Sequence, residues 1–256
     1  MLLVKLITSK IINVLWPRQC MVSGAIITFV TLVSVTASSQ DNSPYSRFGL
    51  GDIVPSTNIN SRGMGGIAAG YSDILTINFN NPASYGSFQT VKEALAKKML
   101  YGRAILDVGL NIENRSLREP NSIEKFSSSN ALFSHVQVGV PLSPGWGLSF
   151  GLRPMSRISY KLNKRELPVD PYSGLPIDSA LTLNEGDGGS YLASVGIGHK
   201  IKLGANQSLS LGINGGYFFG KQDYSNRKTI FNDSITYNSG NFQTTTSYGN
   251  LYFNGG

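Results

Sequence analysis

Residues that could carry catalysis or bind a metal are few in this sequence and lie far apart. The two histidines are His135, on one face of a predicted strand, and His199, at the end of another. A metal site or a catalytic triad needs partner side chains at a defined geometry, and neither position supplies them. Both histidines are therefore expected to be polar residues of a strand wall or rim.

The carboxylates give no stronger signal. Asp107 and Glu113 lie six positions apart on one strand face, about 20 Å apart in an extended strand, which is too far for paired-carboxylate chemistry. The acidic stretches 185–189 and 232–233 contain oxygen ligands of the kind that Ca²⁺ prefers, but neither matches an EF-hand loop. The sequence therefore predicts no enzyme, no metal site and no cofactor.

The N-terminal 40 residues have the features of a secretory signal. They contain no Asp or Glu, and the run from Met21 to Val35 is apolar and is followed by small polar residues. Three cations precede that run: Lys5, Lys10 and Arg18. This order predicts a signal peptide over residues 1–37, cleaved between 37 and 40. An uncleaved anchor is the alternative, because the uncharged span is just long enough to cross a bilayer.

The single cysteine, Cys20, precedes the apolar run, whereas a lipid-anchored cysteine would follow it. Removal of the signal leaves no cysteine, which excludes disulfides, thiol catalysis and cysteine-bound metal in the mature chain. The formal net charge is +7, and loss of the three signal cations lowers it to about +4. That charge is too small to indicate nucleic acid as a partner.

The composition of the 256 residues indicates a membrane barrel. Charged residues make up 14% of the chain, against about 25% in soluble proteins, while the hydrophobic fraction is 41%. Gly, Ser, Asn, Thr and Tyr fill the difference. A chain that alternates apolar with uncharged polar positions has this composition.

From Arg103 onward, apolar residues recur at every second position, which predicts half-buried strands. In the first segment Leu106 and Val108 alternate with Asp107 and Gly109. The segments with this alternation are 103–113, 132–142, 146–158, 191–198 and 209–219, and a sixth begins at Tyr248. In these segments Leu132 and Ile158 are assigned to the apolar face.

The connections between these strands alternate in length. Those at 143–145 and 204–206 are tight turns, whereas 114–130, 159–189 and 221–247 exceed the 12–15 residues usual in a compact domain. Short turns at one end and long loops at the other predict an antiparallel outer-membrane β-barrel. A secreted β-sandwich is the alternative. Because a closed bacterial barrel needs at least eight strands, the chain is expected to be an N-terminal part of one.

The polar faces of the predicted strands are rich in glycine, which leaves room inside the barrel. The Gly-rich stretch 61–86 is expected to fill that room, so the sequence predicts a plug segment over 38–100 and barrel strands over 101–256. Within 38–100 a short helix is expected over 91–100. Four charged residues are expected to face the lumen and to pair with one another or with the plug: Arg103, Asp107, Arg153 and Arg157.

Four short motifs resemble the N-terminal hatch of the long-chain fatty-acid transporter (FadL/TodX) family. They are the run from Arg62 to Gly66, Ala68-Ala69-Gly70, Asp73 and Asn80-Asn81-Pro82-Ala83. The start at 42–49 is similar to a branch that includes the PorV-type barrels of type IX secretion. The resemblance implies a 14-stranded barrel with a kinked hatch at Asn81, Pro82 and Ala83. It also implies a plug built on four glycines: Gly63, Gly65, Gly66 and Gly70.

Two functions follow as expectations. The first is a plugged channel in the outer membrane of a Gram-negative cell that takes up hydrophobic compounds, with outer-membrane lipid and hydrophobic small molecules as partners. The alternative is a non-transporting barrel that is a subunit or partner of a secretion or envelope assembly machine. Envelope proteins would then be its partners.

Overall fold

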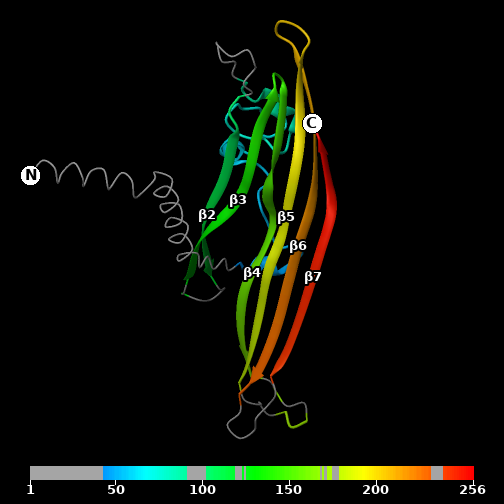
Figure 1. Cartoon of the computed structure of the whole chain (residues 1–256). Coiled ribbons are helices and arrows are strands. Elements are labelled where there is room, and N and C mark those ends of the chain that lie inside the picture. Colours follow the sequence, from blue (N-terminus) through cyan, green and yellow to red (C-terminus); the bar gives the residue numbers. More distant parts are fainter. Residues whose placement is uncertain are drawn as a thin grey trace, which may run out of the picture. The chain divides into compact units, whose positions relative to one another are not determined.

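The computed structural model in Figure 1 describes residues 43–90, 102–118, 123, 125–167, 169, 172–174, 179–231 and 239–256. The chain divides into two compact units, Met1–Ser39 and Gln40–Gly256, and the description below concerns the second. The predicted signal peptide over 1–37 and the predicted helix over 91–100 lie outside the described residues. Both stay predictions.

Six long antiparallel strands form one sheet in chain order, as Figure 1 shows. A two-residue strand, β1 (Asp52–Ile53), pairs with β4 away from this path. The long strands are β2 (Ile105–Arg118), β3 (Lys125–Ser143), β4 (Trp146–Glu166), β5 (Ala180–Lys202), β6 (Ser208–Ile230) and β7 (Gly240–Gly255). The predicted all-β antiparallel architecture, with six long strands, is confirmed.

The sheet is open. In the part of the chain that the structure describes, β2 and β7 are the two edges and do not pair with each other. Closure into a barrel is therefore not established. No helix among the described residues is long and apolar enough to span a bilayer.

The strands extend well beyond their predicted ends. β4 runs to Glu166 and β5 begins at Ala180, so most of the expected loop over 159–189 is strand. The loop expected over 221–247 is shortened in the same way by β6 and β7. The strands were predicted from alternating apolar residues. The backbone hydrogen bonds between strands do not need apolar side chains, and they continue where both faces of the sheet are polar. The predicted long loops are wrong for this reason.

Both expected tight turns are present. Ser143 pairs with Trp146 across Pro144-Gly145, and Gly145 has φ of +81°, which favours glycine at that place in a turn. Lys202 pairs with Ser208 at the second turn, where the Leu203 amide donates to the Gln207 carbonyl at 3.0 Å. The two turns lie at the same end of the sheet because the strands alternate in direction.

The two faces of the sheet differ as the alternation predicts. On the outer face, the apolar residues of β2 are exposed, with Leu106 at 68% and Ile112 at 75%. On the opposite face, here called the inner face, His135 and Gln137 of β3 are almost wholly buried. Apolar side chains that face out and polar side chains that are buried reverse the arrangement of a soluble sheet.

Two β-bulges change which side chains face inward. Ser134 of β3 is an extra residue between the pairs Gly109–His135 and Leu110–Phe133, and Met155 is extra in β4. Beyond each bulge the parity reverses. Leu132 and Ile158, expected on the apolar outer face, are therefore buried on the inner face, and their predicted placement is wrong.

Residues 43–90, here called the N-terminal segment, lie against the inner face. The segment contains the short helical turns η1 (Pro44–Arg47), α3 (Ile59–Gly63) and η2 (Pro82–Ser87). η2 contacts β4, β5 and β6. The apolar core of the N-terminal segment packs against the sheet and consists of Ile77, Tyr85 and Phe88.

Glycines of the strands make this close approach possible. A Cβ added at Gly198 or Gly212 would collide with the Pro82 backbone, and one at Gly139 would lie 2.9 Å from the Phe88 ring. All three glycines are on the inner face. These glycines therefore make room for Pro82 and Phe88, and the plug role of the stretch 61–86 stays a prediction.

Substitution of Gly212 tests this packing. In Gly212→Val, the side chain would displace η2, and overpacking of this kind costs about 1–3 kcal/mol. We expect a lower unfolding temperature in detergent and faster protease cleavage within residues 43–90. Gly204→Val is the matched control, because a Cβ at Gly204 would meet no atom within 4 Å. Equal protease resistance of the two variants would contradict the packing.

Candidate functional site

Polar side chains of the sheet hold the backbone of residues 77–80, which makes no strand pairing of its own. The Asp107 carboxylate of β2 accepts the Ile77 amide at 3.0 Å. Asn214 of β6 donates to the Phe79 carbonyl at 3.0 Å. A buried backbone group without a partner is costly, so these contacts fix where the segment lies.

Two more strands contact Asn80. Asn254 of β7 donates to its carbonyl at 2.8 Å, and Arg153 of β4 donates to its side-chain oxygen at 3.1 Å. Side chains of β2, β4, β6 and β7 therefore converge on Ile77, Phe79 and Asn80. We call this set the 77–80 clamp: Asp107, Arg153, Asn214 and Asn254.

Arg153 has the largest share of the clamp. Its guanidinium also donates to the Ser56 carbonyl at 2.7 Å and lies 4.6 Å from the centre of the Phe79 ring. The residue is only 5% exposed. A buried guanidinium needs such hydrogen-bond and aromatic partners, which here come from two separate parts of the N-terminal segment.

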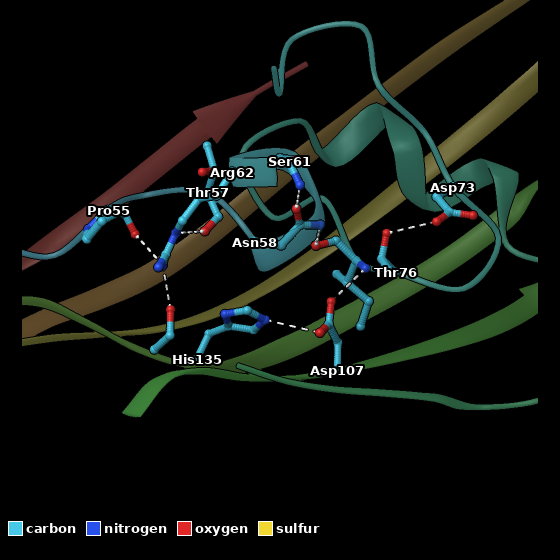
Figure 2. Close-up of polar contacts among 11 residues, drawn as sticks. Pro55, Thr57, Asn58, Ser61, Arg62, Asp73, Thr76, Asp107 and His135 are labelled. Carbon is cyan, nitrogen blue, oxygen red and sulfur yellow. Dashed lines mark hydrogen bonds and ion pairs between the residues drawn. The ribbon is translucent and has the colours of Figure 1, made fainter. Parts of the chain in front are cut away.

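A buried histidine supports Asp107 from the neighbouring strand. Nε2 of His135 lies 3.1 Å from the Asp107 carboxylate, as Figure 2 shows, and the ring meets Phe79 edge to face at 5.2 Å. Gly109 gives the imidazole its space, since a Cβ there would collide with the ring. His135 orients a carboxylate that holds the backbone.

The other histidine is a rim residue. Nδ1 of His199 lies 3.0 Å from the Gly145 carbonyl, and its ring stacks on Trp146 with centroids 4.1 Å apart. Among the described residues, no group of three or more His, Cys, Asp or Glu side chains is placed to hold a metal ion. The contacts of His199 therefore fix the turn end of the sheet, whereas those of His135 fix the N-terminal segment on the inner face.

Arg62 joins α3 to the sheet. Its guanidinium donates to the carbonyls of Pro55 and Thr57 (Figure 2), both at 3.3 Å. It also donates to the Ser134 hydroxyl at 2.6 Å. Desolvation lowers the pKa of this guanidinium, although an arginine stays charged. Asn58 caps α3 by accepting the Ser61 amide at 2.8 Å.

The residues expected to form a hatch lie at the start of η2. The Asn81 side chain accepts the Ala83 amide at 3.1 Å and donates to the Ala69 carbonyl, and Pro82 is the first residue of the turn. Pro82 and Ala83 are buried against the strands. Their role as a kink that moves stays a prediction.

The four expected plug glycines lie away from close contacts. Gly65 and Gly66 have φ of +79° and +84°, so they turn the chain. A Cβ on any of the four would meet no atom within 4 Å: Gly63, Gly65, Gly66 and Gly70. Close approach to the sheet occurs instead at Gly86, where a Cβ would lie 2.6 Å from the Lys200 amide nitrogen.

The four expected lumenal charges are separated by the structure. Asp107 and Arg153 lie on the inner face and contact the N-terminal segment. Arg157, beyond the Met155 bulge, donates to the Phe133 carbonyl of β3, and Arg103 is exposed ahead of β2. The structure therefore brings only Asp107 and Arg153 into the clamp.

Sequence reasoning missed Asn214, Asn254 and the aromatic core of the segment. Tyr85 is 2% exposed and stacks on Phe88 with centroids 5.7 Å apart. Burial raises the pKa of Tyr85 to about 12, so its phenol stays neutral at physiological pH. The available signal was a pair of aromatic residues, Tyr85 and Phe88, two and five positions after the Ala83 of Asn-Pro-Ala.

The clamp predicts the effect of Asp107→Ala. The Ile77 amide and the buried imidazole of His135 would both lose a partner, at about 1–3 kcal/mol for each unsatisfied group. We expect a lower unfolding temperature in detergent and faster proteolysis of residues 43–90. Asp187→Ala is the control, because Asp187 is exposed on β5. If both variants match the wild type, Asp107 does not hold the segment.

A family model, BamG, matches residues 21–256. No curated protein and no solved structure matches the chain.

This match corrects the interpretation drawn from the Gly-rich and Asn-Pro-Ala motifs. The resemblance to the FadL/TodX transporters and their PorV-type branch is wrong, because the matching family is BamG, which is related to the Bam complex. The 14 strands and the uptake of hydrophobic compounds were implied by that resemblance and lose their support. The match covers almost the whole chain, and the chain belongs to the BamG family.

Proposed function

We propose that this protein is a non-transporting, non-catalytic component or partner of the machinery that assembles proteins in the bacterial outer membrane. It embeds its sheet in that membrane through the apolar outer face. Its partners are outer-membrane lipid and envelope proteins. The family match over residues 21–256 is the observation that carries this proposal.

The outer face supports the membrane location. Its exposed apolar side chains continue across the strands, and on β6 they include Leu211 at 54%, Ile213 at 57% and Tyr217 at 52%. An exposed apolar surface of this extent marks a face that lipid or protein covers. Tyr191 and Phe219 stack at 6.0 Å between centroids at the far side of the apolar residues, where interface aromatics are expected.

The inner face supports a role in assembly rather than in passage of solutes. The N-terminal segment is bound there through residues 77–80 and the aromatic core, and the surrounding polar groups of the strands are directed at it. A segment held by several strands acts as an internal support for the sheet. The sheet would then present its edges and outer face to other envelope proteins.

Affinity purification from outer-membrane fractions tests the function. With antibody against the full chain, we expect subunits of the outer-membrane assembly machinery to co-purify in near-stoichiometric amounts. Vesicles that contain the protein should take up fluorescent fatty acid no faster than empty vesicles. Recovery of the chain without any such subunit would contradict the proposal.

A charge on the outer face tests membrane embedding. Ile213→Arg places a cation near the middle of the exposed apolar residues of β6, and a cation near the bilayer midplane costs about 2–4 kcal/mol in an outer-membrane sheet. We expect less protein in the outer-membrane fraction and a lower unfolding temperature. Asn226→Arg is the control, since Asn226 is exposed in the polar part of the same strand. Equal membrane yields would show that Ile213 does not face lipid.

A further inference from the structure

The sheet splits between β3 and β4. Their pairing begins at Ser143–Trp146 beside the turn and ends at Val136–Leu152. Both strands continue past this point, β3 paired with β2 and β4 paired with β5. Within the described residues, the two strands therefore have facing edges that do not pair with each other.

The start of the N-terminal segment occupies the edge of β4. Residues 43–54, here called the strap, run beside residues 155–159. The Val54 amide donates to the Met155 carbonyl at 3.0 Å, and the Ser43 amide donates to the Ser159 carbonyl at 2.8 Å. Between them, β1 pairs antiparallel with β4, with Asp52 opposite Arg157. The edge of β4 thus already accepts an added strand.

The strap covers this edge incompletely. Only Asp52 and Ile53 are in ladder pairing, and the rest of the strap is the turn η1 followed by turns in which Gly49 and Gly51 have φ of +62° and +90°. A regular strand would pair with every residue of the same edge. The strap therefore makes fewer contacts than a regular strand would make at the same place.

Charged side chains lie near the unpaired edges of β3 and β4. Asp52 of the strap forms an ion pair at 2.8 Å with Arg115 of β2, and Arg157 of β4 donates to the Phe133 carbonyl of β3. A strand placed along the edge of β4 would meet both guanidinium groups. An acidic residue in the register of Asp52 would replace its ion pair with Arg115, which also pairs with Glu113 of β2 at 2.6 Å.

We propose that the β4 edge over residues 153–159 is a strand-docking site, which the strap occupies within the chain and an extended strand of another envelope protein occupies in the complex. The incoming strand pairs antiparallel with β4 and carries an acidic residue opposite Arg157, within reach of Arg115. This inference rests on the proposed function and names the surface through which the partner binds. Strand addition at an open edge supplies affinity through backbone hydrogen bonds.

Locking the strap to β4 tests the docking site. Ile53 and Ser156 are direct antiparallel partners, and such pairs have Cα separations that a disulfide can bridge. The double variant Ile53→Cys/Ser156→Cys keeps the strap in place when oxidised and releases it when reduced. We expect oxidation to lower co-purification of the assembly machinery at least tenfold and reduction to restore it.

The matched control is a disulfide elsewhere on the sheet. Asn184 and Asn226 are direct partners on β5 and β6, so Asn184→Cys/Asn226→Cys adds an equivalent cross-link and leaves the strap free. We expect this variant and both single variants, Ile53→Cys and Ser156→Cys, to bind as the wild type does. A photoreactive residue at Ser159 should cross-link to a subunit of the machinery only in the unlocked chain.

The outcomes separate this inference from the proposed function. If the locked and control chains co-purify equally with the machinery, the proposed function stands and the docking site is overturned. Absence of co-purification in the wild type and in all variants overturns the proposed function and the docking site with it. Loss of binding in the locked chain alone supports both.

Discussion

The arrangement of this protein depends on how the backbone at residues 77–80 satisfies its hydrogen bonds. This stretch lies against the sheet but pairs with none of its strands. Side chains of Asp107, Asn214 and Asn254 provide partners for its backbone, and Arg153 donates to the Asn80 side chain. Each buried group left without a partner would cost about 1–3 kcal/mol. The polar side chains of the inner face therefore hold residues 77–80 in one position on the sheet.

The two faces of the sheet carry different kinds of side chain and contact different surroundings. The outer face exposes large apolar side chains, which require lipid or another protein to cover them. The inner face carries glycines where η2 lies against it and polar side chains where the clamp forms. One alternating sequence gives both, because successive side chains of a strand point to opposite faces.

The sequence predicted the alternation but not its interruptions. Leu106 and Val108 face outward as expected because no bulge precedes them on β2. Leu132 and Ile158 face inward because one extra residue in each strand reverses the parity. Pro154, directly before Met155, is a local signal of a bulge in β4, whereas nothing in the local composition marks Ser134 as bulged. The polar ends of the strands were not predicted, because they are strand only through pairing with neighbouring strands and have no apolar alternation of their own.

The candidate site was predictable only in part, and its family was assigned wrongly. Asp107 and Arg153 were identified by parity, whereas Asn214 and Asn254 are ordinary polar residues until the fold brings them to the segment. The Asn-Pro-Ala motif has a local physical role, since Asn81 caps a turn that Pro82 begins. Such a role can arise in unrelated segments that pack on a glycine-lined sheet. The motif therefore gave a family resemblance that the BamG match overturns.

Hydrogen exchange of the full chain in native outer-membrane vesicles tests most directly whether the N-terminal segment is an integral part of the sheet. The clamp and the aromatic core predict that amides in residues 77–88 exchange as slowly as those of β4, β5 and β6. The exposed residues 205 and 206 of the second turn provide the rate of an unprotected segment. Exchange of residues 77–88 at the rate of that turn would contradict the account, because the segment would then not be held on the inner face.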